Sequence, residues 1–273
     1  MLSRFSQHIT RRLLATPLAI WGKLPSHCDF LRHRASACQA RDWQEWVACT
    51  WRNGPVKQTY TARMRARQTV MGEAGWLTLE PRKPAVDLGA VPVAFVMQPG
   101  VMPFSPNHCV QGVMVASQDQ IGRAFPLVVF QQITSGWLLR TWAGKPGPSQ
   151  HDMLYWLARI LARTHSANKD WDALTQTVDR VWHSQKPGLR HLLGAPLAMP
   201  PRTDLEDVLH GYCANTSADS AQGLHGVQHM PWSHWPAHSL RASQAAHSFW
   251  QQDMAGGYVN AGQSIAALWG ART

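Results

Sequence analysis

Apolar residues in this chain fall into short runs separated by prolines, glycines and polar clusters. Residues 91–97, 109–116 and 127–133 are rich in the β-branched and large apolar side chains that strands favour. An earlier run, residues 18–24, predicts a further strand that ends at Pro25. Because several of these runs are continuously apolar rather than alternating, we expect helices to cover both faces of the sheet.

Helical periodicity occupies other parts of the chain. Apolar residues recur at helical spacing within residues 37–52, and residues 60–68 predict a second, basic helical piece. A third helix is expected to begin at Ser149 or Asp152, either of which can cap it. Residues 171–182 repeat the same pattern. The sequence therefore alternates between sheet-forming and helix-forming segments.

The last third of the chain has weaker patterning. Residues 186–236 are rich in Pro, Gly, Ser and His, which indicates loops with short helices. Residues 265–269 predict a closing helix. No internal repeat is present in the sequence.

The chain has 273 residues and a net charge of +10, and the positive charge is concentrated near the N-terminus. Residues 1–90 contain 14 Lys and Arg against 6 Asp and Glu, whereas residues 91–273 contain 12 against 10. The basic patch includes Arg32, Arg34, Arg52, Lys57, Arg63, Arg65 and Arg67. Such a patch favours an acidic partner, so binding to nucleic acid or to an anionic surface is the alternative hypothesis. The lack of an aromatic-interleaved RNA motif, zinc finger or recognition helix argues against nucleic acid.

Cysteine usage and the first residues bear on the compartment. The cysteines are five in number and form no C-x-x-C pair, which fits free thiols in a reducing cytoplasm. Residues 1–16 are basic and mildly apolar, as in a signal peptide or a twin-arginine leader. Thr16 and Pro17 interrupt the apolar stretch, so we expect a disordered or non-family extension instead. No apolar run reaches the length of a membrane-spanning helix, and membrane insertion is not expected.

Two segments carry a more specific signature. Residues 21–30 read WGKLPSHCDF and are followed by Trp43 and Trp46 on the predicted helix. Residues 112–127 read GVMVASQDQIGRAFPL. Within the second segment, Ser117 and Asp119 are short acceptors that set turns, and Gly122 permits a positive φ.

These segments resemble the TagF family of type VI secretion, whose patterns read roughly W/Y-G-K-L-P-S-x-G-D-F, then W-D-x-W, and G-V-L-M-P-S-x-D-x-V-G-R-x-F-P-L. Cys28 stands where the family usually has Gly, Ala116 where it has Pro, and Gln44 where it has Asp. The resemblance is strong over residues 17–135 and loose over residues 136–273.

The resemblance implies an α/β fold, namely a three-layer α/β/α sandwich with a central mixed sheet flanked by helices, in a single domain of residues 17–273. It implies a cytoplasmic, non-enzymatic accessory protein without cofactor or metal. Such a protein would regulate assembly of the secretion apparatus after translation by binding another type VI component, such as the forkhead-associated scaffold protein.

The family motifs supply the candidate interaction residues. These are Gly22, Lys23, Pro25, Asp29, Phe30, Trp43, Trp46, Ser117, Asp119, Gly122, Arg123, Phe125 and Pro126. Arg123 can pair with Asp119 or span to Asp29 because its guanidinium offers five donors in a planar fork. Two hypotheses remain for Asp29, Ser117, Asp119 and Arg123: a polar surface that a partner grips, or an internal network that holds two loops together.

The sequence also contains residue types found in catalytic and metal sites. Ser26, His27 and Asp29 have the residue types of nucleophilic catalysis, but adjacency in sequence does not create triad geometry. The pairs His225/His229 and His234/His238 have helical ligand spacing. Prolines interrupt that segment, and no Cys or carboxylate lies within it, so we interpret these histidines as solvated loop residues.

Overall fold

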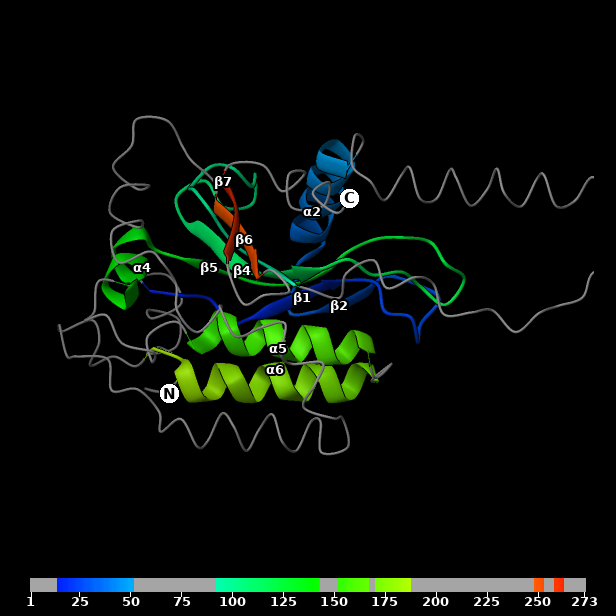
Figure 1. The fold of residues 1–273 in the computed structure, drawn as a ribbon. Helices are drawn as coiled ribbons and strands as arrows, with labels where there is room; N and C mark the ends of the chain where they lie inside the picture. The colour runs from blue at the N-terminus through cyan, green and yellow to red at the C-terminus, as the bar shows by residue number, and fades with distance from the viewer. Residues whose placement is uncertain are drawn as a thin grey trace, which may run out of the picture.

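The computed structural model describes residues 14–51, 92–142, 152–166, 170–187, 248–252 and 258–262. Its strands are β1 (Ala19–Gly22), β2 (Leu31–His33), β3 (Val93–Met97), β4 (Cys109–Val115), β5 (Leu127–Ile133), β6 (Ser248–Gln252) and β7 (Tyr258–Gly262). Its helices are α2 (Ala37–Trp51), α4 (Ser135–Trp142), α5 (Asp152–Ser166) and α6 (Trp171–Gln185). The elements form one open sheet with helices packed against it (Figure 1).

Within the described residues, the sheet has seven strands in the order β2-β1-β5-β4-β3-β6-β7. Every ladder between these strands is antiparallel, so the expectation of a mixed sheet was wrong. The continuous apolar runs behind that expectation report burial on both faces, which antiparallel strands also acquire when helices cover both sides. The sequence neighbours β3, β4 and β5 are also neighbours in the sheet, whereas β1 and β6 join them from distant parts of the chain.

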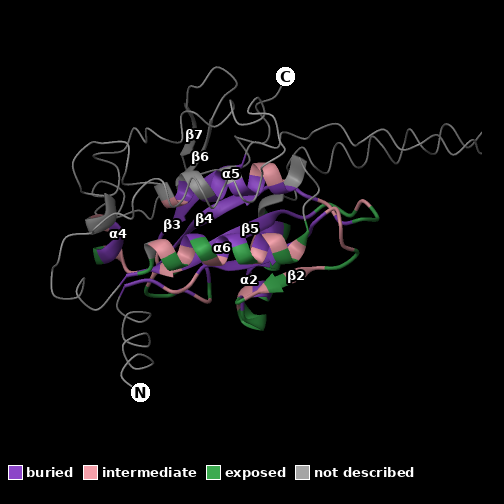
Figure 2. Ribbon diagram, turned by 90° about the horizontal axis from the view of Figure 1, so that it is seen from below, coloured by how far each residue is buried: buried purple, intermediate pink, exposed green. Residues whose placement is uncertain are grey.

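Side chains of each central strand alternate between two hydrophobic clusters. In β4, Val113 belongs to one cluster and Met114 to the other, and both are fully buried. Helices α4, α5 and α6 supply the first cluster, while Trp43 and Val47 of α2 pack into the second. Helices therefore cover opposite faces of the sheet, with α2 on one side and α5 and α6 on the other (Figure 1). The central strands are correspondingly buried along their length (Figure 2).

Most predicted elements of the first two-thirds are confirmed. The predicted strand 127–133 coincides with β5, and β1, β3, β4, α2, α5 and α6 each lie within a few residues of their predicted bounds. The elements β2, α4, β6 and β7 were not predicted. The predicted helices 60–68 and 265–269, and most of the predicted loop segment from residue 188 onward, lie outside the described residues.

Residues 14–16, which precede the expected start of the domain at residue 17, pack against the sheet. Leu14 is buried in the cluster beneath α5, and Ala15 forms an antiparallel bridge with Ile133. The hydroxyl of Thr16 accepts a hydrogen bond from the Gln132 backbone N–H at 2.9 Å. These three residues thus extend the β1 side of the sheet, and residues 1–13 lie outside the described part.

Candidate functional site: two interlocked loops

The two family motifs form two loops at the same end of the sheet. The first loop follows β1, and the second joins β4 to β5, which pairs directly with β1. Gly22 begins the first loop at φ +141°, where a Cβ would lie 2.1 Å from the Pro126 backbone oxygen. Only glycine allows this close approach between the end of β1 and the start of β5.

A buried ion pair joins the loops. Lys23 Nζ lies 2.8 Å from Asp119 Oδ2, and the two side chains are only 5% and 0% exposed. The Ser117 hydroxyl donates to the Lys23 backbone oxygen at 2.8 Å. Charges this far from solvent are stable only when paired and hydrogen-bonded, so Lys23 and Asp119 depend on one another.

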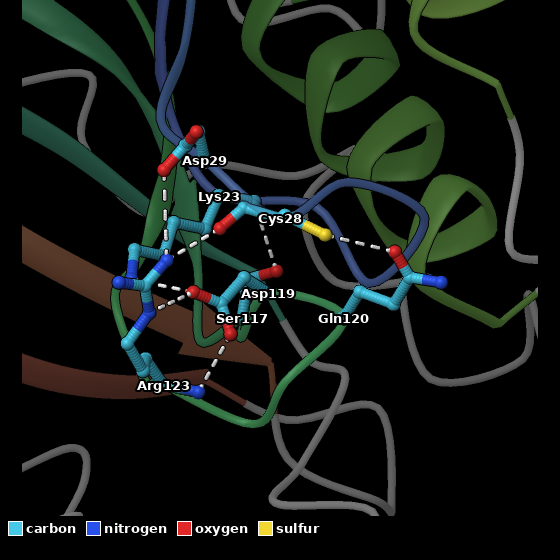
Figure 3. Close-up of polar contacts among 7 residues, drawn as sticks. All are labelled: Lys23, Cys28, Asp29, Ser117, Asp119, Gln120 and Arg123. Carbon is cyan, nitrogen blue, oxygen red and sulfur yellow. Dashed lines mark hydrogen bonds and ion pairs between the residues drawn. The ribbon is translucent and has the colours of Figure 1, made fainter.

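Arg123 completes the coordination of the Asp119 carboxylate (Figure 3). Its backbone N–H donates to Oδ1 at 2.7 Å and its Nε–H donates to Oδ2 at 2.6 Å. Burial alone would raise the pKa of Asp119, but hydrogen bonds from Lys23 and Arg123 outweigh it and lower that pKa to about 2. The same hydrogen bond stabilises the charged form of the Arg123 guanidinium and therefore raises the pKa of Arg123. Asp119 is therefore held as the anion.

The two loops also contact one another through hydrogen bonds and an ion pair outside the buried Lys23–Asp119 pair. An Arg123 NH2 group donates to the Cys28 backbone oxygen and lies 3.6 Å from Asp29 Oδ1. The Gln120 backbone N–H donates to the His27 oxygen at 2.9 Å, and the Cys28 thiol donates to the Gln120 side-chain oxygen at 3.0 Å. Both backbones and side chains thus fix the loops against one another (Figure 3).

Aromatic rings form the floor of the loops. Phe30 stacks on Trp21 with ring centroids 4.7 Å apart and contacts Phe125 edge-on at the same centroid distance. Lys23 Nζ lies 4.7 Å from the Phe30 centroid, a cation–π arrangement. The Phe30 and Phe125 positions in the motifs therefore serve packing beneath the ion pair.

Trp43 and Trp46 lie away from the loops, on α2. Trp43 is fully buried and contacts Phe95 and Phe130 edge-on, with centroids 5.6 and 5.4 Å apart. Trp46 packs edge-on against Trp43 and is partly buried. These tryptophans attach α2 to the sheet rather than joining the loop cluster.

Burial separates the four polar candidates into two kinds. Ser117 and Asp119 are buried and belong to the internal network that one hypothesis described. Asp29 and Arg123 have side chains that are 93% and 52% exposed. Both proposed pairings of Arg123, with Asp119 and with Asp29, are present.

Among the described residues, several ion pairs were not foreseen in the sequence, and two arrangements of them join distant parts of the chain. One is the Lys23–Asp119 pair, since the motif named both residues but gave no contact between them. The other lies at the β2 edge of the sheet: Asp179 of α6 accepts from His33 at 3.0 Å and from Arg34 at 2.9 Å. Arg34 has φ +57°, the one positive φ of a non-glycine residue in the described chain, and no sequence signal marks it.

The catalytic candidates Ser26, His27 and Asp29 lie in the first loop, between β1 and β2. Ser26 Oγ lies 2.9 Å from His27 Nδ1, but the Asp29 carboxylate faces Arg123. Among the described residues, no group of three or more His, Cys, Asp or Glu is placed to hold a metal ion, and no helix is long and apolar enough to span a membrane. The four histidines of the 225–238 segment lie outside the described residues, as do all the basic-patch residues beyond Arg34.

Comparison with known proteins defines the class of this α/β domain. The family model of the TagF N-terminal domain, type VI secretion system-associated, matches residues 83–181, a span that includes the second loop and the strands beside it. Residues 83–181 thus match the family that the motifs resemble, and the resemblance is confirmed over that span.

Among solved structures, the chain is similar to the crystal structure of PA0076 from Pseudomonas aeruginosa PAO1 at 2.05 Å resolution. The two share 18% identity over 93% of this chain and 92% of that chain, with a TM-score of 0.47. None of the curated proteins matches the sequence.

Proposed function

We propose that this chain is a cytoplasmic accessory protein of type VI secretion that regulates assembly of the apparatus by binding another of its components, without catalysis. The observation that carries this proposal is the pair of interlocked loops. Residues of both family motifs converge there, with the charged groups that hold the loops buried and the outer groups accessible. A rigid, solvent-facing pair of loops suits recognition because little conformational entropy is lost on binding.

The buried and exposed residues have different roles in this proposal. Lys23, Ser117 and Asp119 fix the loops from within, while Asp29 and Arg123 face the partner. A protein component of the apparatus, such as the forkhead-associated scaffold, is the partner implied by the family. The chain is proposed to be a single three-layer α/β/α domain, which is supported by α2 and α5 on opposite faces and by the pairing of β3 with β6.

Co-purification from the native host tests this function. The tagged full-length chain is recovered at moderate salt, and the associated proteins are identified by mass spectrometry. Recovery of a type VI component is expected, and Asp29→Ser should reduce it while leaving thermal stability unchanged. Glu45→Ser on α2 is the matched control. Like Asp29, Glu45 has an exposed carboxylate, at 67%, and its contact with an arginine, Arg41, is long at 4.0 Å.

The outcomes separate the hypotheses. If the wild-type chain recovers no type VI protein and recovers nucleic acid in a steeply salt-dependent manner, the proposed function is wrong. If both carboxylate variants retain full recovery, Asp29 makes no contact with the partner.

A further inference from the structure

Two glutamines lie opposite one another inside the sheet, on the face that α5 covers. Gln111 of β4 and Gln131 of β5 are direct partners in the antiparallel register, and they are only 4% and 3% exposed. Their neighbours two positions along each strand, Val113 and Val129, belong to the hydrophobic cluster beneath α5. Because alternate residues of a strand share a face, both amides project into that apolar cluster.

Each of these side chains carries an oxygen that no protein group pairs. Among the described residues, neither Gln111 Oε1 nor Gln131 Oε1 has a hydrogen-bond donor, and both atoms are buried. The Gln131 amide nitrogen donates to the Met153 sulfur of α5 at 3.6 Å, which orients that amide through its nitrogen. Native proteins rarely leave a buried acceptor without a donor, because it has lost its bonds to solvent. Two such acceptors side by side therefore indicate a donor that they share.

The surroundings restrict what this donor can be. The partner of Gln111 on its other side is Val96 of β3, an apolar residue of the same cluster. The backbone groups of β4 are occupied by its ladders with β3 and β5. The donor must therefore be small, and it must offer two hydrogens. Water meets both conditions, and buried waters in proteins typically bridge polar groups that have no other partner.

We propose that Gln111 and Gln131 form a binding site for a buried water molecule, which donates one hydrogen bond to each Oε1 between β4, β5 and α5. The water links the two strands through their side chains, in addition to the backbone ladder that already joins them. The site lies in the interior and is not part of the interlocked loops. The inference is therefore independent of the proposed function.

A double-mutant cycle with Gln111→Met and Gln131→Met in the full-length chain tests the shared donor. Methionine is close to glutamine in length and volume but lacks the amide. Each single variant should lower the urea midpoint, because the water and the remaining amide lose a partner. The double variant should lose less than the two single losses combined, since nothing is then left unpaired. The control combines Gln111→Met with Gln132→Met and should be additive, because the Gln132 amide donates to the Phe104 backbone oxygen at 3.1 Å.

Water–amide cross-relaxation, measured by NMR on the wild-type chain, identifies the donor without any variant. The side-chain amide protons of Gln111 and Gln131 should show rotating-frame cross-peaks at the water frequency, with the sign of dipolar contact rather than of chemical exchange. If these cross-peaks are missing, no water is held there, and coupling in the cycle would then mean that the two amides bond one another directly. Additive losses in the cycle, or a raised midpoint in either single variant, would show that the oxygens share no donor. Either result overturns the inference.

Discussion

The stability of the loop pair depends on the buried charge of Asp119. The substitution Asp119→Asn keeps the size of the side chain and removes its charge. It leaves the Lys23 ammonium, which is 5% exposed and 2.8 Å from its former counterion, buried without an opposite charge. Breaking a buried ion pair by removing one partner costs about 3–5 kcal/mol. Because single domains are stable by only about 5–15 kcal/mol, this loss is a large share of the total.

Urea denaturation followed by circular dichroism measures the effect. The free energy of unfolding should fall by about 3–5 kcal/mol in Asp119→Asn, with the midpoint shifted and the slope unchanged. The control is Asp29→Asn, which also changes a carboxylate facing Arg123 but at a 93% exposed position, and it should lose much less.

A double substitution isolates the ion pair itself. Lys23→Met combined with Asp119→Asn removes both charges, so it should be more stable than Asp119→Asn alone. The reasoning is refuted if Asp119→Asn loses less than about 1 kcal/mol, the value typical of exposed pairs, or if the double variant is no more stable than the single one.

Further predictions concern pH, backbone geometry and the contacts of Asp179 at the β2 edge of the sheet. Because the folded-state pKa of Asp119 is about 2, below its ordinary 3.8, its stabilising contribution should be complete above 3.8 and disappear as pH falls toward 2. Acid titration of wild type and Asp119→Asn should differ in that window. Gly22→Ala should lower the melting temperature strongly because its Cβ would clash with the Pro126 oxygen, whereas Gly136→Ala, with open space around it, should not. Asp179→Ala should lower stability by about 1 kcal/mol or less, as measured by urea titration, and the loss should shrink at high salt.

The central sheet could be predicted because burial on two faces leaves a direct trace in composition. The strand β5 matches its predicted range because all but one of its seven residues are buried, and the apolar residues Leu127–Phe130 and Ile133 record that burial in the sequence. The edge strand β2 left no such trace. It has three residues, Leu-Arg-His, of which none is buried, and its pairing with β1 depends on tertiary contacts alone.

The candidate site was predictable in its members but not in its arrangement. The motifs identified Lys23 and Asp119, yet their pairing across 96 residues follows from β1 lying beside β5, which no local pattern encodes. The distinction between buried Asp119 and exposed Asp29 has the same origin, since both are aspartates in polar loop sequences.

The place of β6 in the sheet has a consequence for synthesis of the protein. Strand β3 pairs on one side with β4, its neighbour in sequence, and on the other with β6, about 150 residues later. During synthesis on the ribosome, the backbone groups on that edge of β3 therefore stay unpaired until the residues of β6 have been made. An unpaired edge on such an apolar strand is a site for aggregation. Truncation before residue 248 should consequently yield insoluble protein, even though every residue of the interlocked loops would still be present.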